Sequence, residues 1–200
     1  MALTTREQLL ATAEQLFAEK GFYGASIATI AKELGLTKQA LLHHFGNKEK
    51  LYGEVLSALS ARLAAGINNI RQQRLPPGEQ LEEMLLAQYR EQMTNQNAAR
   101  LIMRELLDNE ARADQAGNWY LKDYLEELVE TARAASPGAK PSRAAALALV
   151  YQLLGAAHYF AISQPTLVNI FGKATLNRTR QQFEAQLRAI VQASLSTLAS

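Results

Sequence analysis

Apolar residues recur every three or four positions along most of the chain, and this spacing is that of an α-helix. The pattern is clearest between residues 26 and 46. One helical face in this stretch collects the side chains of Ile27, Ile30, Ala31 and Leu34. A second short helix places Leu41 and Phe45 on its inward face. We therefore predict two short helices that pack against each other.

Capping and turn residues mark the ends of these helices. Ser26 and Thr37 are well suited as N-caps, because a hydroxyl oxygen can accept from a free N–H of the first turn. Gly35 can take the left-handed conformation that ends a helix at no Cβ cost. Asn47 can cap a third helix that follows at once. The sequence thus predicts a helix, a tight turn and a helix over about residues 27–46.

The second of these helices turns its polar side chains away from the apolar face. A helix that is held by its neighbour and carries exposed hydrogen-bonding groups fits the DNA major groove. A plain helical hairpin in an all-α core would show the same spacing. Two further features favour DNA binding. Residues 5–20 form an amphipathic third helix, and Lys48 lies at a helix start where phosphate binds readily.

Residues 5–52 resemble the N-terminal domain of the TetR family of bacterial transcriptional repressors. The resemblance is carried by Leu16–Phe22, Thr29–Thr37 and His44–Leu51, which agree in order, spacing and residue type. One position departs from the pattern: family members usually have a tyrosine where this chain has Leu42. A leucine offers only apolar contact there, for example to a thymine methyl group.

The resemblance and the helix geometry together predict the DNA contacts. The residues expected at base edges are Lys38, Gln39, Ala40, Leu42 and His43. The residues expected at phosphates are Ser26, Thr29, Thr37, His44 and Lys48. Between residues 37 and 51 three lysines oppose only Glu49, so the local charge suits DNA although the whole chain carries only +2.

The remainder of the chain also has helical spacing. We predict helices near 48–72, 79–94, 97–109, 117–135, 142–163 and 177–198. Breaks are expected at residues 75–78 and 136–141, and a loop from Ser163 to about Asn177. The predicted fold is all-α with about nine helices. A helix-turn-helix DNA-binding domain would occupy residues 1–52, and a ligand-binding and dimerisation domain residues 53–200.

Residues 144–162 are apolar almost all round. A transmembrane helix is the competing interpretation, since about 20 apolar residues span a bilayer. The alanine-rich composition, with Gln152 and His158 in the interior, favours a helix covered by its own domain on one side and by a second subunit on the other. The resemblance likewise implies a homodimer through the last two long helices, with no membrane partner. Such a dimer would read a pseudo-palindromic operator.

Aromatic, methionine and polar residues gather in the central helices. The candidate ligand-binding residues are Met84, Tyr89, Met103, Trp119, Tyr120, Tyr124, Tyr151, His158 and Tyr159. At helical spacing such residues are usually plain core, yet buried tyrosine, tryptophan and histidine need polar partners, and this mixture lines small-molecule pockets. The resemblance favours an inducer cavity here.

The composition narrows the possible chemistry. The chain has no cysteine, and His43 and His44 point about 100° apart on a helix, so neither suggests a metal site. No phosphate-binding loop, nucleophile elbow or zinc spacing occurs, so we expect neither a cofactor nor an enzyme. The N-terminus lacks a signal-peptide pattern, which predicts a cytoplasmic protein.

The sequence therefore predicts a homodimeric transcriptional repressor that binds double-stranded DNA and responds to a small-molecule effector. Two rival classes are an enzyme on an all-α scaffold and a helical adaptor that binds another protein. Activation of transcription, rather than repression, is a further alternative.

Overall fold

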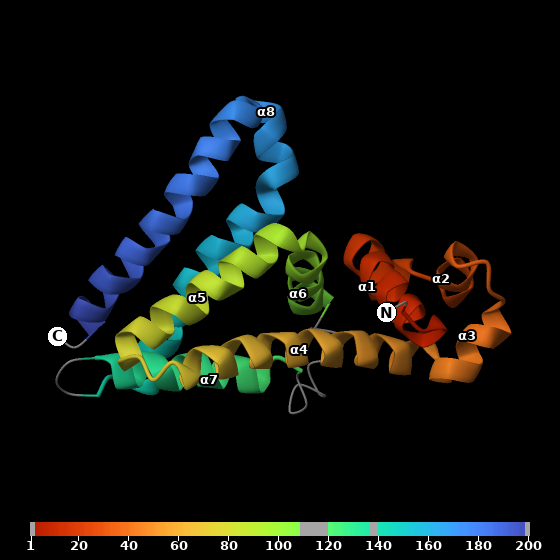
Figure 1. Ribbon diagram of the computed structural model, residues 1–200, viewed down its shortest axis with the longest axis horizontal. Helices are drawn as coiled ribbons and strands as arrows, with labels where there is room; N and C mark the ends of the chain where they lie inside the picture. The colour runs from red at the N-terminus through yellow and green to blue at the C-terminus, as the bar shows by residue number, and fades with distance from the viewer. Residues whose placement is uncertain (1–2, 109–119, 137–139, 199–200) are drawn as a thin grey trace. The chain divides into compact units, whose positions relative to one another are not determined.

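The structure is a computed structural model that describes residues 3–108, 120–136 and 140–198. These residues form eight helices and no strand, which confirms the predicted all-α fold (Figure 1). In chain order the helices are α1 (Thr5–Gly24), α2 (Ile27–Glu33), α3 (Lys38–Phe45), α4 (Lys48–Gln72), α5 (Pro77–Thr94), α6 (Gln96–Asp108), α7 (Lys122–Ala135) and α8 (Arg143–Leu198). Gly172 interrupts α8, so this helix consists of two helical halves.

The chain forms two compact units. The first comprises the described parts of Met1–Arg62 and Asn97–Tyr120, and the second those of Leu63–Gln96 and Leu121–Ser200. Helix α4 is continuous and supplies residues to both. The first unit thus takes in more of the chain than the predicted DNA-binding domain.

The core of the first unit follows the helical spacing of the sequence. Its fully buried side chains include Leu9, Phe17, Ile30, Ala31, Leu41 and Leu51. The rings of Phe17 and Tyr52 meet edge to face, with centroids 4.8 Å apart. These contacts pack α1 and α4 around the predicted pair of short helices, α2 and α3.

Helix α6 and Tyr120 also belong to the first unit. The Tyr52 hydroxyl donates to a Glu105 carboxylate oxygen at 2.7 Å, and Ser60 Oγ donates to the Tyr120 carbonyl at 2.6 Å. A Cβ atom on Gly53 would lie 2.6 Å from the Tyr120 hydroxyl oxygen and would displace the end of that exposed side chain. Polar contacts from a distant part of the sequence therefore fix α4 within this unit.

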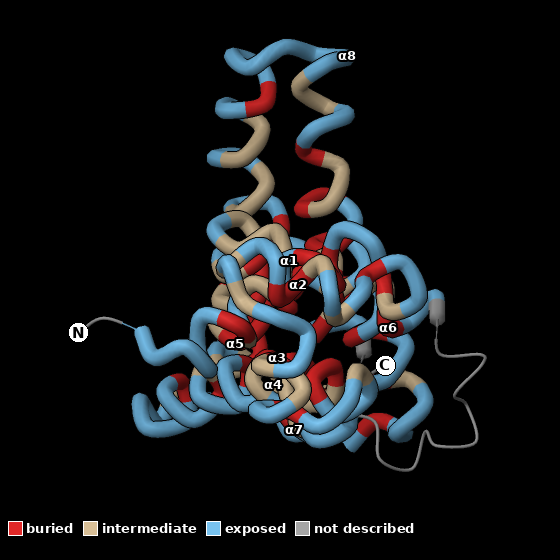
Figure 2. Tube along the Cα trace, turned by 90° about the vertical axis from the view of Figure 1, so that its right-hand side faces the viewer, coloured by how far each residue is buried: buried red, intermediate tan, exposed pale blue. Residues whose placement is uncertain are grey.

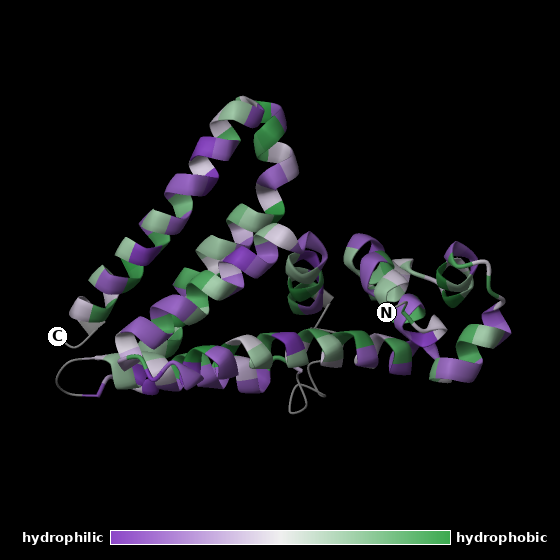
Figure 3. Cartoon of the chain, viewed as in Figure 1, coloured by the Kyte–Doolittle hydropathy of each residue, from purple (hydrophilic) through white to green (hydrophobic). Residues whose placement is uncertain are grey.

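The second unit packs α5, α7 and α8 against one another. Its buried apolar residues include Leu81, Leu86, Leu128, Val150, Ala161 and Val191. Buried and exposed positions alternate along both halves of α8 (Figure 2), and apolar and polar residues alternate with them (Figure 3). By length and composition α8 could cross a membrane, but 44% of its most apolar stretch is buried inside the protein, and the core helix of a soluble protein passes the same test.

The predicted loop from Ser163 to Asn177 is wrong, because this stretch is helical on both sides of Gly172. Pro165 lies inside the helix, although proline removes one backbone hydrogen bond there. The interruption comes instead at Gly172, whose φ of +77° is readily adopted only by glycine. Gln164 links the two halves: its side-chain nitrogen donates to the Phe160 carbonyl, and its oxygen accepts from Arg180 Nε at 2.6 Å.

Candidate DNA-binding helix and buried polar cluster

Three predicted caps and one predicted turn define the ends of α2, α3 and α4. Ser26 Oγ accepts from the Thr29 N–H at 3.1 Å, and Thr37 Oγ1 accepts from the Ala40 N–H at 3.1 Å. Asn47 Oδ1 accepts from the Lys50 N–H at 2.8 Å. Gly35 has a φ of +66°, as predicted for the turn. Local hydrogen bonds thus fix where α3 begins and where the chain leaves it.

Helix α3 has a buried apolar side and an exposed polar side. Leu41 and Phe45 are buried. The predicted DNA-contacting residues of this helix are exposed at Lys38, Gln39, His43 and His44, and half-buried at Ala40 and Leu42. The two histidine rings lie edge to face with centroids 6.0 Å apart. The structure therefore presents four exposed hydrogen-bonding side chains on a helix whose opposite side is buried.

The candidate phosphate-binding residues differ in whether their polar groups already contact other residues of the protein. Thr37 caps its helix through an oxygen lone pair, so its O–H can still donate to a phosphate. Ser26 also caps through a lone pair, but its Oγ shares a further hydrogen bond with Thr29 Oγ1 at 2.8 Å. Lys48 is half-buried, and its ammonium nitrogen lies 4.5 Å from the centroid of the Phe22 ring. This cation–π contact positions Lys48 at the start of α4.

Tyr23 was not predicted as a functional residue. It is 68% exposed and precedes the Ser26 cap by three positions. Its ring packs edge to face on Phe22, with centroids 5.3 Å apart. An exposed tyrosine immediately before a helix-turn-helix could have been noticed in the sequence, because its phenol is a phosphate donor.

The predicted ligand-binding residues belong to both units. Met84, Tyr89, Tyr124 and His158 are buried in the second unit. Met103 and Tyr120 belong to the first unit. Tyr151 and Tyr159 lie on the exposed side of α8, at 49% and 74% exposure. Trp119 lies outside the described residues. The first four are therefore the ones suited to a buried site, and the ligand role of all nine stays a prediction.

Two glutamines of α5 hold the buried polar side chains of the second unit. The Tyr124 hydroxyl donates to Gln88 Oε1 at 3.0 Å. Gln92 Nε2 and His158 Nε2 are 2.8 Å apart, and His158 Nδ1 is 2.8 Å from the Leu154 carbonyl. Gln88 and Gln92 were missed by the sequence analysis, although two polar residues one turn apart on an otherwise apolar helix face are a visible signal.

Burial determines the protonation of this cluster, which comprises Gln88, Gln92, Tyr124 and His158. Desolvation lowers the pKa of His158 and raises the pKa of the Tyr124 hydroxyl. Both side chains are therefore neutral near pH 7. Because Nδ1 of neutral His158 must carry the proton to reach the Leu154 carbonyl, Nε2 accepts, and Gln92 must donate to it.

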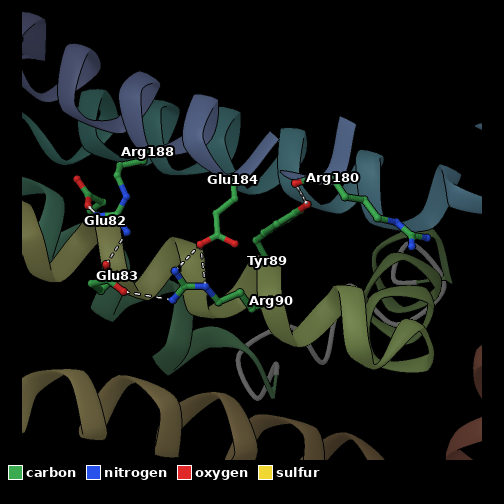
Figure 4. Close-up of polar contacts among 7 residues, drawn as sticks. All are labelled: Glu82, Glu83, Tyr89, Arg90, Arg180, Glu184 and Arg188. Atoms are coloured by element: carbon green, nitrogen blue, oxygen red, sulfur yellow. Dashed lines mark hydrogen bonds and ion pairs between the residues drawn. The ribbon is translucent and has the colours of Figure 1, made fainter. Parts of the chain in front are cut away.

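Ion pairs and stacked rings join α5 to the second half of α8. Arg188 pairs with the buried Glu82 and, at 2.9 Å, with Glu83 (Figure 4). Arg90 reaches both Glu83 and Glu184. The Tyr89 ring of α5 stacks on Phe183 with centroids 5.2 Å apart, and Phe183 also stacks on Phe160 of the first half of α8 at 4.2 Å. Two arginines and three glutamates are thus paired with one another, whereas Arg180 Nε donates to the neutral Gln164 side chain.

The two halves of α8 also expose apolar and small residues. The exposed set includes Ala144, Leu147, Ala148, Tyr151, Gly155, Ala156 and Tyr159 in the first half, and Ala185, Ala189, Ile190 and Ala193 in the second. Within each half the positions are three or four residues apart and so lie along one side of the helix. Among the described residues, no group of three histidine, aspartate or glutamate side chains is placed to hold a metal ion.

Residues 9–55 match the family model described as bacterial regulatory proteins, tetR family. The chain is 33% identical over 66 residues to the HTH-type transcriptional repressor AcnR of Corynebacterium efficiens. The matched residues make up 33% of this chain and 35% of that protein. It is 31% identical over 84 residues to the HTH-type transcriptional repressor KstR2 of Mycobacterium tuberculosis, 42% of each. The chain thus spans less than half the length of these curated relatives.

Solved structures resemble the chain over nearly its full length. A chain from Shewanella sp. PV-4, described as a tetR family transcription regulator, gives a TM-score of 0.68 at 25% identity and covers 98% of this chain and 97% of its own. The ketosteroid transcriptional regulator KstR2 of Mycobacterium tuberculosis gives 0.68 at 20% identity, over 94% of this chain and 95% of its own. The second likeness shows the fold alone.

Proposed function

Since the chain belongs to the TetR family of bacterial regulators through its N-terminal residues 9–55, we propose that it is a ligand-responsive transcriptional repressor. In this proposal it binds a pseudo-palindromic operator as a homodimer and is released by a small-molecule inducer in the cytoplasm. Proteins of this family are DNA-binding regulators and not enzymes. The observation that carries the proposal is the exposed polar side of α3. Leu41 and Phe45 are buried on the opposite side of this helix.

The exposed side of α8 supports the homodimer. One recognition helix contacts only a few base pairs, whereas two helices about 34–36 Å apart read two half-sites. Tyr151 and Tyr159, with the small residues Gly155 and Ala156 between them, offer an apolar surface on which a symmetric copy can pack closely. Joining two weak half-site contacts in one dimer raises the affinity for the operator without any new contact.

Release by an inducer is proposed to act through α4. This helix begins at Lys48, just after α3, and its residues from Leu63 onward belong to the second unit. A ligand that favours another position of α4 changes the spacing of the two recognition helices. By linkage, DNA then weakens ligand binding by the same factor. Equal ligand affinity with and without operator would refute this mechanism.

The experiment for DNA binding is the double variant Lys38→Ala with Gln39→Ala. DNA fragments that the wild-type protein retains from its own genome serve as probes. Loss of two base contacts, at about 1–3 kcal/mol each, should weaken specific binding by about a hundredfold or more. Circular dichroism and sedimentation should show unchanged folding and assembly.

Its matched control is Gln15→Ala with Lys20→Ala, which removes the same side-chain types from the exposed side of α1. The control should bind the fragments as the wild-type protein does. A protein adaptor without a DNA role would be indifferent to both changes, so equal binding by the two double variants contradicts the proposal.

A further inference from the structure

Helix α5 buries two amide side chains one turn apart. Gln88 is 4% exposed and Gln92 is fully buried. Each amide uses one atom within the protein: Gln88 Oε1 accepts from Tyr124, and Gln92 Nε2 donates to His158. Among the described residues the other two atoms, Gln88 Nε2 and Gln92 Oε1, have no hydrogen-bond partner.

The partners of the two glutamines fix which atoms remain. If the Gln92 amide were turned over, its oxygen and the lone pair of His158 Nε2 would be two acceptors facing each other. Gln92 Nε2 therefore faces His158, and Gln92 Oε1 points away from it. The buried Tyr124 hydroxyl needs an acceptor for its proton, and Gln88 Oε1 supplies it, so the Gln88 nitrogen is the atom left over. A buried polar atom without a partner costs free energy, and native proteins leave few of them. A donor and an acceptor therefore remain on residues one turn apart on one face of α5.

We propose that Gln88 Nε2 and Gln92 Oε1 recognise the effector, and that the effector is an uncharged, mainly apolar molecule carrying an acceptor next to a donor. A carboxamide, or a hydroxyl beside a carbonyl, has this pattern. The inference rests on the proposed function, since it names the ligand class of the proposed regulator. Tyr124 and His158 act as positioning residues that orient the two amides.

The lack of charge within the cluster indicates a neutral ligand. The four side chains of the cluster carry no charge near pH 7. On the same helices, Glu82, Glu83, Arg90, Glu184 and Arg188 already form ion pairs among themselves (Figure 4). The Arg180 guanidinium bonds Gln164 Oε1 rather than a residue of the cluster. An ionised ligand would therefore be buried without a counter-charge from the cluster itself, which is strongly unfavourable. Met84, Leu128 and Leu153 of the same three helices are buried and apolar, and such side chains suit the rest of the molecule.

The experiment compares three probes of equal chain length with the full-length protein. Octanamide has both a donor and an acceptor, methyl octanoate only acceptors, and octanoate a negative charge. Calorimetry should show octanamide binding at least about tenfold more tightly than either of the others, because each of these leaves one amide atom unpaired. The side-chain amide signals of Gln88 and Gln92 should shift in the ¹⁵N spectrum.

Two double variants test the residues. Gln88→Met with Tyr124→Phe, and Gln92→Met with His158→Phe, remove both members of a hydrogen-bonded pair, so folding is preserved. Each should weaken octanamide binding by about tenfold or more. Gln186→Met, at an exposed position of α8, is the matched control and should bind as the wild-type protein does.

Three outcomes overturn the inference: octanoate binding as tightly as octanamide, double variants that keep wild-type affinity for octanamide, or no binding of any probe at millimolar concentration. The retained DNA fragments separate this failure from that of the proposed function. If the protein binds those fragments through Lys38 and Gln39 but octanamide does not bind most tightly of the three probes, only the ligand assignment is wrong and the proposed function stands.

Discussion

Gly35 joins α2 to α3 in a conformation that a side chain would disfavour. Its φ is +66°, and no atom lies within 4 Å of where a Cβ would stand, so the constraint is purely conformational. Gly35→Ala should lower the free energy of unfolding by about 1–2 kcal/mol. Urea denaturation followed by circular dichroism measures this.

The matched control for this prediction is Gly66→Ala in α4. Gly66 also has nothing within 4 Å of a Cβ, but it has ordinary helical geometry. Alanine there should raise the free energy of unfolding by about 1 kcal/mol. A Gly35→Ala protein as stable as the wild type would show that the turn does not need glycine.

His158 gives the stability of the protein a pH dependence. Burial lowers its pKa in the folded state below the ordinary value of 6.5, so the unfolded chain binds a proton more readily. The stability due to neutral His158 is complete above pH 6.5 and is lost as the pH falls below this value. The slope contributed is at most about 1.4 kcal/mol per pH unit.

Denaturation at a series of pH values below 6.5 tests this prediction. The variant His158→Phe should lack this part of the slope, whereas Gln92→Met keeps the buried imidazole and should retain it. Identical slopes in the wild type and His158→Phe would contradict the assignment.

At the scale of elements, the salt bridge between Glu82 and Arg188 fixes α5 against the second half of α8. Glu82 is buried, and Gln192 Nε2 also donates to it at 2.7 Å. Arg188→Met leaves this carboxylate without its cation and should lower the free energy of unfolding by about 2–4 kcal/mol. Thermal denaturation gives the comparison.

A double variant distinguishes a lost attraction from an uncompensated charge. Adding Glu82→Met to Arg188→Met removes the buried carboxylate as well, and most of the lost stability should return. If the double variant is as unstable as Arg188→Met alone, the destabilisation comes from lost packing rather than from the unpaired charge.

The elements that local chemistry determines were predicted well. The caps Ser26, Thr37 and Asn47 and the turn at Gly35 act within four residues, so the sequence shows them directly. The stretch around Pro165 was mispredicted as a loop. There the contact of Gln164 with Arg180 and the stacking of Phe160 on Phe183 hold the two helical halves together, and such contacts cannot be read from local residue preferences.

The same distinction applies to the candidate sites. The exposed side of α3 follows from helical spacing alone. The buried cluster depends on pairs that are far apart in the chain: Gln88 with Tyr124 is separated by 36 residues, and Gln92 with His158 by 66. The sequence indicated Tyr124 and His158 as polar residues in need of partners, but only the structure identifies the glutamines.

At the scale of the whole molecule, the exposed side of α8 predicts the state of assembly. The double variant Tyr151→Glu with Tyr159→Glu places two charges on the proposed dimer surface. Sedimentation velocity should show a dimer for the wild type and a monomer for the variant. Its affinity for the retained DNA fragments should fall by about 10²–10⁴-fold, because the two half-site contacts are no longer joined.

The control for assembly is Asn68→Glu with Asn69→Glu, which adds the same charges at exposed positions of α4. This protein should remain a dimer. A wild-type monomer, or a dimer that survives both glutamates on α8, would contradict the proposed interface.

The neutrality of the Gln88 and Gln92 cluster bears on how the effector arrives. A molecule without charge can diffuse through the lipid envelope, whereas an ion pays a large desolvation cost there and needs a transporter. If the proposed effector comes from the surroundings of the cell, a regulator that binds it can respond without a dedicated uptake system.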